Sequence, residues 1–79
     1  MTKQKLQSIA NKISKRYDMP NPIITRRQQG VYGYTGYEIR TELPSYAGGF
    51  ELQEMIEDTF KGVLVENQGH CVYFAYQDN

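Results

Sequence analysis

The sequence contains one cysteine, no tryptophan and no long apolar segment. A single cysteine excludes an internal disulfide and every zinc site built from several cysteines, and it favours a reducing compartment. No stretch approaches the roughly 20 apolar residues that a transmembrane helix needs. The first residues also lack the apolar run of a signal peptide. We therefore expect a cytoplasmic protein with no membrane role.

Motifs for catalysis and for cofactor binding are lacking as well. His70 and Cys71 are the only histidine and cysteine, and as neighbours in a predicted strand they would point to opposite faces and could not share a proton. A metal site needs three or four convergent ligands, which the sequence does not offer. The glycine-rich segment 30–36 lacks the lysine and the following helix of a phosphate-binding loop. The sequence thus predicts a non-enzymatic protein without catalytic residues, metal or cofactor.

The net charge of zero conceals a strong asymmetry along the chain. Residues 1–40 carry eight basic and two acidic side chains, a charge of +6, whereas residues 41–79 carry one basic and seven acidic side chains, a charge of −6. Two interpretations follow. The halves neutralise each other through internal salt bridges, or they present two docking surfaces of opposite sign. A self-complementary homodimer is compatible with the second interpretation.

Apolar residues at intervals of three and four predict two helices. The first spans about residues 3–17, with Thr2 as its N-cap, and it ends before Pro20 because proline cannot continue a helix. The second spans about residues 50–61. The paired glycines before it predict that residues 48–49 belong to a loop.

The segments between the helices read as strands, and the first pair predicts a hairpin. Strand 23–28 runs on to Tyr34 and turns at Thr35-Gly36, where Gly36 supplies a positive φ. This turn pairs Tyr34 with Tyr37, Tyr32 with Ile39 and Val31 with Arg40, and it puts the paired tyrosines on one face. The alternation is imperfect near the turn, so a bulge or a turn at Gln29-Gly30 is the alternative.

A second hairpin is predicted after the second helix. Strands 63–66 and 70–77 flank a turn at Gln68-Gly69, which pairs Val65 with Val72 and Val63 with Phe74. Apolar residues on both faces indicate a central position in the sheet or a surface that meets a partner.

These elements predict a single small α+β domain, residues 1–79, in the order α-β-β-α-β-β. A four-stranded, mainly antiparallel sheet with two helices packed on one face is the simplest arrangement, because both amphipathic helices then share one core. A chain of this size buries only about 60 to 65% of its unfolded surface. It therefore has little room for a deep catalytic cleft.

The strongest functional signal is the number of tyrosines, seven in 79 residues. Tyrosine is enriched at protein interfaces, so we expect docking to an unknown protein partner through the tyrosine-bearing first hairpin or through the acidic second helix. The residues expected at this interface are Tyr34, Tyr37, Tyr46, Glu51, Glu54, Glu57 and Asp58. An inhibitor or regulator of a larger machine, of the phage or mobile-element type, fits the size and composition.

Nucleic-acid binding by the basic half is the alternative function. Tyrosine rings stack on bases, and basic side chains neutralise phosphates. The residues expected to contact phosphates are Lys5, Lys12, Lys15, Arg16, Arg26, Arg27 and Arg40.

Overall fold

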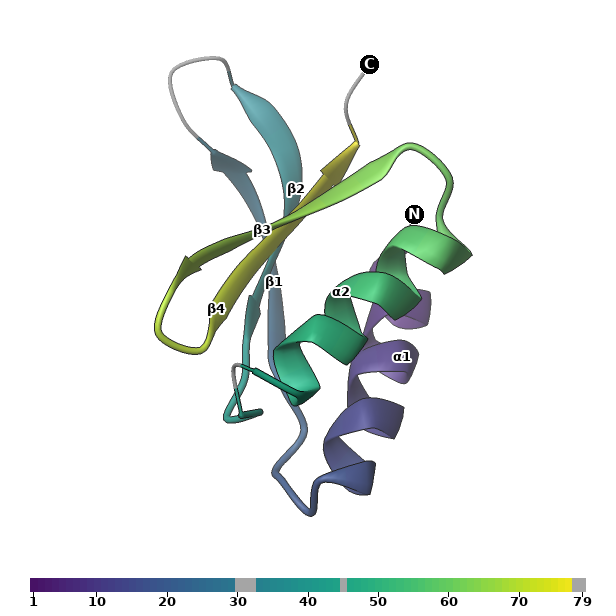
Figure 1. The fold of residues 1–79 in the computed structure, drawn as a ribbon. Helices are drawn as coiled ribbons and strands as arrows, with labels where there is room; N and C mark the ends of the chain where they lie inside the picture. Colours follow the sequence, from purple (N-terminus) through teal and green to yellow (C-terminus); the bar gives the residue numbers. More distant parts are fainter. Residues whose placement is uncertain (30–32, 45, 78–79) are drawn as a thin grey trace.

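A computed structural model describes residues 1–29, 33–44 and 46–77 of the chain (Figure 1). Two helices and four strands follow one another in the predicted order. The elements are α1 (Lys3–Arg16), β1 (Ile23–Gln29), β2 (Tyr34–Arg40), α2 (Gly48–Thr59), β3 (Val63–Gly69) and β4 (Val72–Gln77). Within these described ranges, neither helix is long and apolar enough to cross a membrane.

The four strands form one antiparallel sheet in the order β1-β2-β4-β3. Both helices cover the same face of the sheet (Figure 1), which confirms the predicted fold class. β4 lies between β2 and β3, so its apolar residues on both faces do mark a central strand. The other face of the sheet is covered by neither helix, and we call it the open face.

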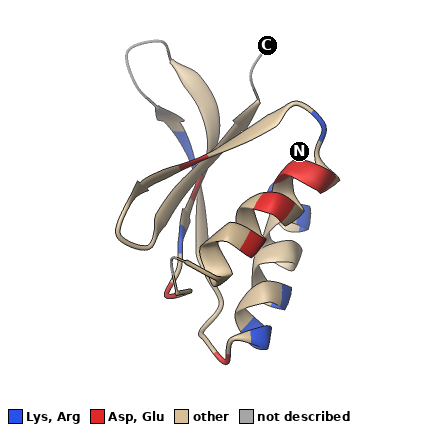
Figure 2. Cartoon of the chain, viewed as in Figure 1, with Lys and Arg blue, Asp and Glu red and all other residues tan. Residues whose placement is uncertain are grey.

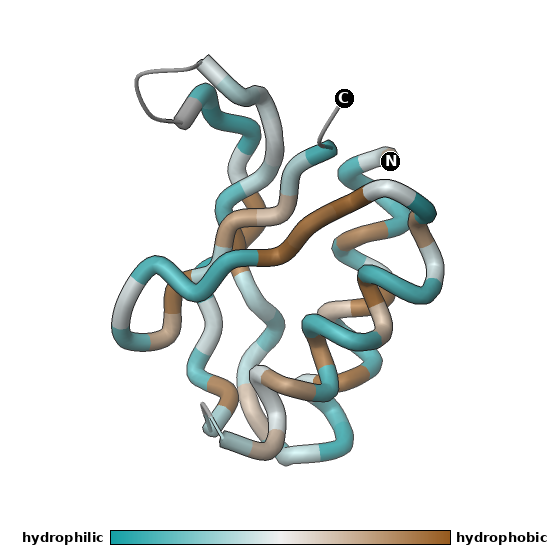
Figure 3. The backbone as a smooth tube through the Cα atoms, turned by 45° about the horizontal axis from the view of Figure 1, so that its top comes forward, coloured by the Kyte–Doolittle hydropathy of each residue, from teal (hydrophilic) through white to brown (hydrophobic). Residues whose placement is uncertain are grey.

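The core lies between the two helices and the sheet. Leu6 and Ile13 of α1 and Leu52 and Ile56 of α2 are fully buried there. The strands contribute Ile24, Tyr37, Ile39, Val63, Val65, Tyr73 and Ala75. The beginning of β3 is the longest strongly hydrophobic segment of the backbone (Figure 3). Full burial of one large apolar side chain contributes about 1.5–3 kcal/mol, so this single core provides most of the stability.

The ends of α1 follow from local chemistry. The Thr2 hydroxyl oxygen accepts a hydrogen bond from the Lys5 backbone N–H at 3.3 Å, and this confirms Thr2 as the N-cap. The helix ends at Arg16, one residue earlier than predicted. Asp18 then adopts a left-handed φ of 57°, which turns the chain towards β1.

The predicted turn of the first hairpin is wrong. Thr35 and Gly36 lie inside β2, where they pair with Gln28 and Arg27 of β1. A Cβ at Gly36 would overlap the carbonyl oxygen of Ala75, so this glycine permits the close approach of β4 and makes no turn. The positive φ that such a connection needs occurs at Gly33, with φ 69°. The rest of the connection, residues 30–32, lies outside the described residues.

The true register separates the tyrosines that were expected on one face. Tyr37 pairs with Arg26, and Tyr34 pairs with Gln29. Ile39 and Arg40 pair with Ile24 and Ile23, so neither pairs with Val31 or Tyr32 as expected. Because side chains alternate along a strand, Tyr37 points into the core, whereas Tyr34 belongs to the open face.

The second hairpin also turns later than predicted. Gly69 pairs with Val72, so His70 and Cys71 form the turn, and Cys71 takes the left-handed φ of 59°. Gly69 instead belongs to an irregularity in β3, where its N–H donates to the Asn67 side-chain oxygen at 2.9 Å. Val65 therefore pairs with Ala75 and Val63 with Gln77, instead of Val72 and Phe74.

This shift of the register fixes which residues of β4 reach the open face. Tyr73 and Ala75 lie in the core, whereas Phe74 and Tyr76 lie on the open face. Their rings stack with centroids 5.5 Å apart, and the Tyr76 hydroxyl donates to the Glu66 carboxylate at 2.6 Å. Phe74 is only 1% exposed although no helix covers it.

The second helix begins earlier than predicted, at Gly48 instead of residue 50, and it ends at Thr59 instead of residue 61. Both glycines of its first turn are buried. A Cβ at Gly49 would overlap the Tyr73 hydroxyl. The paired glycines therefore belong to the helix, and they let its first turn pack tightly against the sheet.

The substitution Gly49→Ala should destabilise the fold by about 1–3 kcal/mol, because the new methyl group overlaps the Tyr73 side chain. At a helix position where nothing touches the new methyl group, Gly→Ala raises the free energy of unfolding by about 0.5–1 kcal/mol. Whether Gly49→Ala raises or lowers this free energy therefore tests the packing against Tyr73. Urea denaturation measures it. In a Tyr73→Phe background the cost should be smaller, and stabilisation by Gly49→Ala alone would contradict the close contact.

Candidate protein-docking surface

One surface of α2 combines exposed aromatic and acidic side chains. Tyr46, Phe50, Glu54 and Asp58 follow one another at intervals of four residues, so the three that lie in α2 share its outward side. Tyr46 is 90% exposed and Phe50 is 61% exposed. Glu54 and Asp58 are exposed as well, and Figure 2 shows the acidic residues along the helix. We call these four residues the α2 ridge.

The other two acidic residues expected at an interface are engaged within the fold. Glu51 forms an ion pair with Arg16 and accepts a hydrogen bond from the Tyr17 hydroxyl at 2.9 Å. The Glu57 carboxylate accepts from the backbone N–H of Val65 at 3.3 Å. Glu51 thus joins α2 to α1, and Glu57 joins α2 to β3. In contrast, Glu54 and Asp58 make no hydrogen bond or ion pair with any described residue.

The two tyrosines expected beside this surface lie elsewhere. Tyr37 is 9% exposed, and its ring lies in the core with the Arg26 guanidinium 5.9 Å from its centroid. Tyr34 is 42% exposed on the open face, where its ring centroid lies 5.3 Å from that of Tyr76. Of the expected tyrosines, only Tyr46 therefore lies on the α2 ridge.

The basic residues expected to contact nucleic acid are divided among three places. Four of the seven lie on α1, where Lys5, Lys12 and Lys15 are exposed and form no ion pair with a described residue, whereas Arg16 pairs with Glu51. Arg26 stands on the face of β1 that the helices cover. Arg27 and Arg40 lie on the open face. The structure therefore does not join the seven residues into one surface.

Arg27 and Arg40 both bind Glu38, which is nearly buried between them. Arg27 donates to one carboxylate oxygen at 2.6 Å and Arg40 to the other at 2.9 Å. Burial alone would raise the pKa of Glu38, but the hydrogen bonds from Arg40 and Arg27 and their positive charges outweigh it. The pKa is therefore held below the ordinary value of 4.5. This cluster ties β1 to β2 on the open face and occupies both arginines.

A hollow of about 520 Å³ lies on the outward side of α1 and on the segment that follows it. Lys12, Lys15 and Met19 line it together with the polar residues Ser8, Asn11, Asp18 and Asn21. Met19 is one of the more exposed large apolar residues of the described chain. We call this feature the α1 hollow. It combines aliphatic and thioether surface with two cationic groups and the carboxylate of Asp18.

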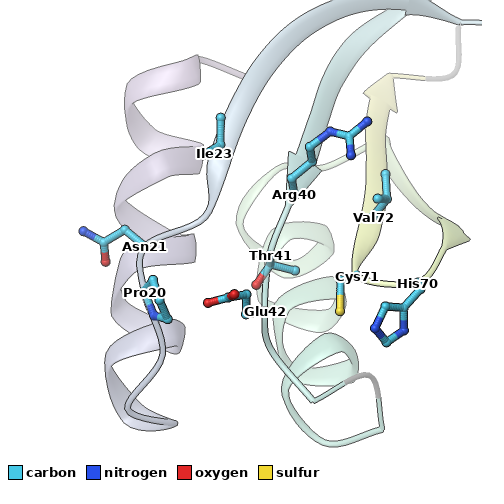
Figure 4. A pocket seen from close by; sticks show the side chains of 9 residues that line it. All are labelled: Pro20, Asn21, Ile23, Arg40, Thr41, Glu42, His70, Cys71 and Val72. Atoms are coloured by element: carbon cyan, nitrogen blue, oxygen red, sulfur yellow. The ribbon is translucent and has the colours of Figure 1, made fainter.

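A second hollow, of about 380 Å³, lies at the end of the sheet (Figure 4). His70 and Cys71 contribute to it from a turn, so the expectation that they point to opposite faces of a strand does not apply. Figure 4 shows Arg40 pointing away from both side chains, towards the Glu38 carboxylate that it binds. No cluster of three metal-binding side chains occurs among the described residues. The charged groups of this hollow therefore do not converge on one point.

Comparison with known proteins yields no match to a family model, to a curated protein or to a solved structure. The candidate surface therefore rests on the geometry of the chain itself. Phe50 is the residue of the α2 ridge that the sequence analysis missed. It lies outside the apolar stripe that includes Leu52 and Ile56, and it follows Tyr46 by four residues, so its exposure could have been predicted from the periodicity.

The lowered pKa of Glu38 predicts a pH-dependent contribution to stability. The pKa is lower in the folded than in the unfolded chain, so this contribution is present above the ordinary value of 4.5 and is lost as the pH falls through the folded pKa. Glu38→Gln should destabilise the protein at about pH 7 and should flatten the loss of stability between about pH 5 and pH 3. Urea denaturation across this range measures both effects.

The exposed and unpartnered Glu54 provides the control. Glu54→Gln should follow the wild-type dependence of stability on pH. If Glu38→Gln also followed the wild-type curve, the ion-pair cluster would not contribute to the stability of the fold.

Proposed function

We propose that this chain is a non-enzymatic protein that docks onto another protein through the α2 ridge. The observation that carries the proposal is the exposed aromatic pair Tyr46 and Phe50 at the beginning of α2. Phe50 is 61% exposed, although the helix that carries it packs closely on the core. Two nearby carboxylates, those of Glu54 and Asp58, have no partner among the described residues and support the same surface.

The chemistry of the α2 ridge indicates the kind of partner. Buried aromatic side chains dominate the binding energy of many interfaces, each accounting for about 2 kcal/mol or more when truncated. Carboxylates at the rim contribute more to the rate and orientation of association than to affinity. The partner should therefore offer an apolar pocket for the aromatic pair beside basic groups for Glu54 and Asp58.

A chain of this size can regulate or inhibit a larger protein simply by occupying one of its surfaces. We place this action in the cytoplasm, because the only cysteine is unpaired and a reducing compartment keeps it so. The proposed role requires no turnover.

Phe50→Ala should weaken binding of the partner by about 30-fold, the equivalent of about 2 kcal/mol. The melting temperature should change little because the side chain is exposed. The immobilised protein would capture partners from a lysate of the source cells, and calorimetry with the purified partner would give the affinity. Glu54→Lys should weaken binding mainly through slower association.

The matched control is Ile23→Ala on β1, because Ile23 is 67% exposed and lies away from the α2 ridge. This variant should bind as the wild type does. Equal losses in Ile23→Ala and Phe50→Ala would show that the ridge has no special role, and so would unchanged binding by Phe50→Ala.

Nucleic acid should not bind strongly, because the basic residues are divided among three places. Titration with mixed-sequence DNA and RNA, single- and double-stranded, at about 50 and 200 mM salt should leave the tyrosine fluorescence unchanged. The absence of tryptophan keeps this signal clean. Salt-sensitive quenching would favour phosphate contacts over protein docking.

A further inference from the structure

The structure places opposite charges on the two helices that cover the sheet. Arg16 at the end of α1 pairs with Glu51 in the first turn of α2, and the two helices run in roughly opposite directions (Figure 1). Basic residues follow one another along α1 and acidic residues along α2 (Figure 2). Lys12 and Lys15 on α1, and Glu54 and Asp58 on α2, form no ion pair within the described chain.

The same layer carries an exposed aromatic pair and a hollow. The two aromatic residues of the α2 ridge, Tyr46 just before α2 and Phe50 in its first turn, are exposed. The α1 hollow lies at the end of α1 and is lined by Lys12, Lys15 and Met19. Because the helices are antiparallel, both features lie at the same end of the layer. The lysines of the α1 hollow and the carboxylates of the α2 ridge are opposite in charge.

We propose that a second copy of this chain is a partner of the α2 ridge, and that each copy inserts its ridge into the α1 hollow of the other in a two-fold dimer. The proposal rests on the proposed function, since it names an occupant for the same docking surface. An isologous contact of this kind uses the ridge and the hollow of both copies, so every favourable contact occurs twice.

Charge selects the direction of the two-fold axis. An axis along the mean direction of the two helices places α1 of one copy against α2 of the other and keeps the same ends of the layers together. An axis across the helices places α1 against α1 and α2 against α2, so like charges face each other. The first arrangement brings the aromatic pair to the α1 hollow, and it is the arrangement that we propose.

The contacts expected inside the α1 hollow are specific. Aromatic rings pack well against a thioether, as at Met19, and lysine stems cover apolar surface while their ammonium groups stay at the edge. Glu54 lies one helical turn beyond Phe50. Lys12 lies about one turn before Lys15 on the antiparallel helix of the other copy, so the carboxylate of Glu54 faces a cationic group.

A charge exchange tests this arrangement. The wild-type protein should dimerise in sedimentation equilibrium, with a dissociation constant that rises as salt increases from about 50 to 500 mM. The variants Lys12→Glu/Lys15→Glu and Glu54→Lys/Asp58→Lys should each dimerise at least about tenfold more weakly, because like charges then face each other. An equimolar mixture of the two variants should restore a dimer, since all facing charges are again opposite.

The control Lys3→Glu/Lys61→Glu changes the net charge by the same amount as the lysine variant but leaves the α1 hollow intact. It should dimerise as the wild type does. A monomeric wild type at all concentrations would overturn the proposed dimer, as would variants that dimerise normally. A mixture that stays monomeric while the wild type dimerises would place the interface elsewhere. Circular dichroism and melting curves confirm that each variant is folded.

The two proposals fail in different ways. If the wild type is monomeric but Phe50→Ala still weakens binding of a foreign partner, the proposed dimer is wrong and the proposed function stands. If the charge-exchange variants behave as expected but no foreign protein binds through the α2 ridge, the dimer stands and docking to a foreign protein is wrong.

Discussion

Both helices of this small chain must share one core with a single face of the sheet, and most other features depend on that packing. Leu6 and Ile13 of α1 meet Leu52 and Ile56 of α2 over the sheet. The beginning of α2 can approach the sheet only because Gly49 leaves space for the Tyr73 hydroxyl. Since one side of each helix is committed to this core, the remaining polar and aromatic side chains can only face outward.

The two helices were predictable from the sequence, because the buried residues of each recur at one regular interval. The buried stripes of α1 and α2 repeat every three to four residues, and the Thr2 cap and the following prolines define the limits of α1. The order of the elements and their arrangement in layers follow from these stripes, because two amphipathic helices and one four-stranded sheet have few other ways to form a common core.

The turns were not predictable, because the glycines that suggested them serve another purpose. Gly36 permits β2 to approach β4, and Gly69 lies in an irregularity of β3. When the pairing of a strand shifts by an odd number of residues, every side chain of that strand moves to the other face of the sheet. The wrong position of the first turn therefore put Tyr34 and Tyr37 on the same face. In the candidate site, the sequence indicated that α2 is acidic. It could not show that Glu51 and Glu57 bind within the fold while Glu54 does not, since that depends on distant segments.

The position of β4 in the sheet also has a consequence for how the chain folds. Each hairpin joins strands that are close in sequence, but the pairing of β2 with β4 joins the first half of the chain to the last. Local pairs close rapidly, whereas pairs separated by a long loop form slowly because more chain entropy is lost before the contacts form. The two α-β-β halves can therefore begin to organise separately, and the meeting of β2 and β4 becomes the slow step that completes the core.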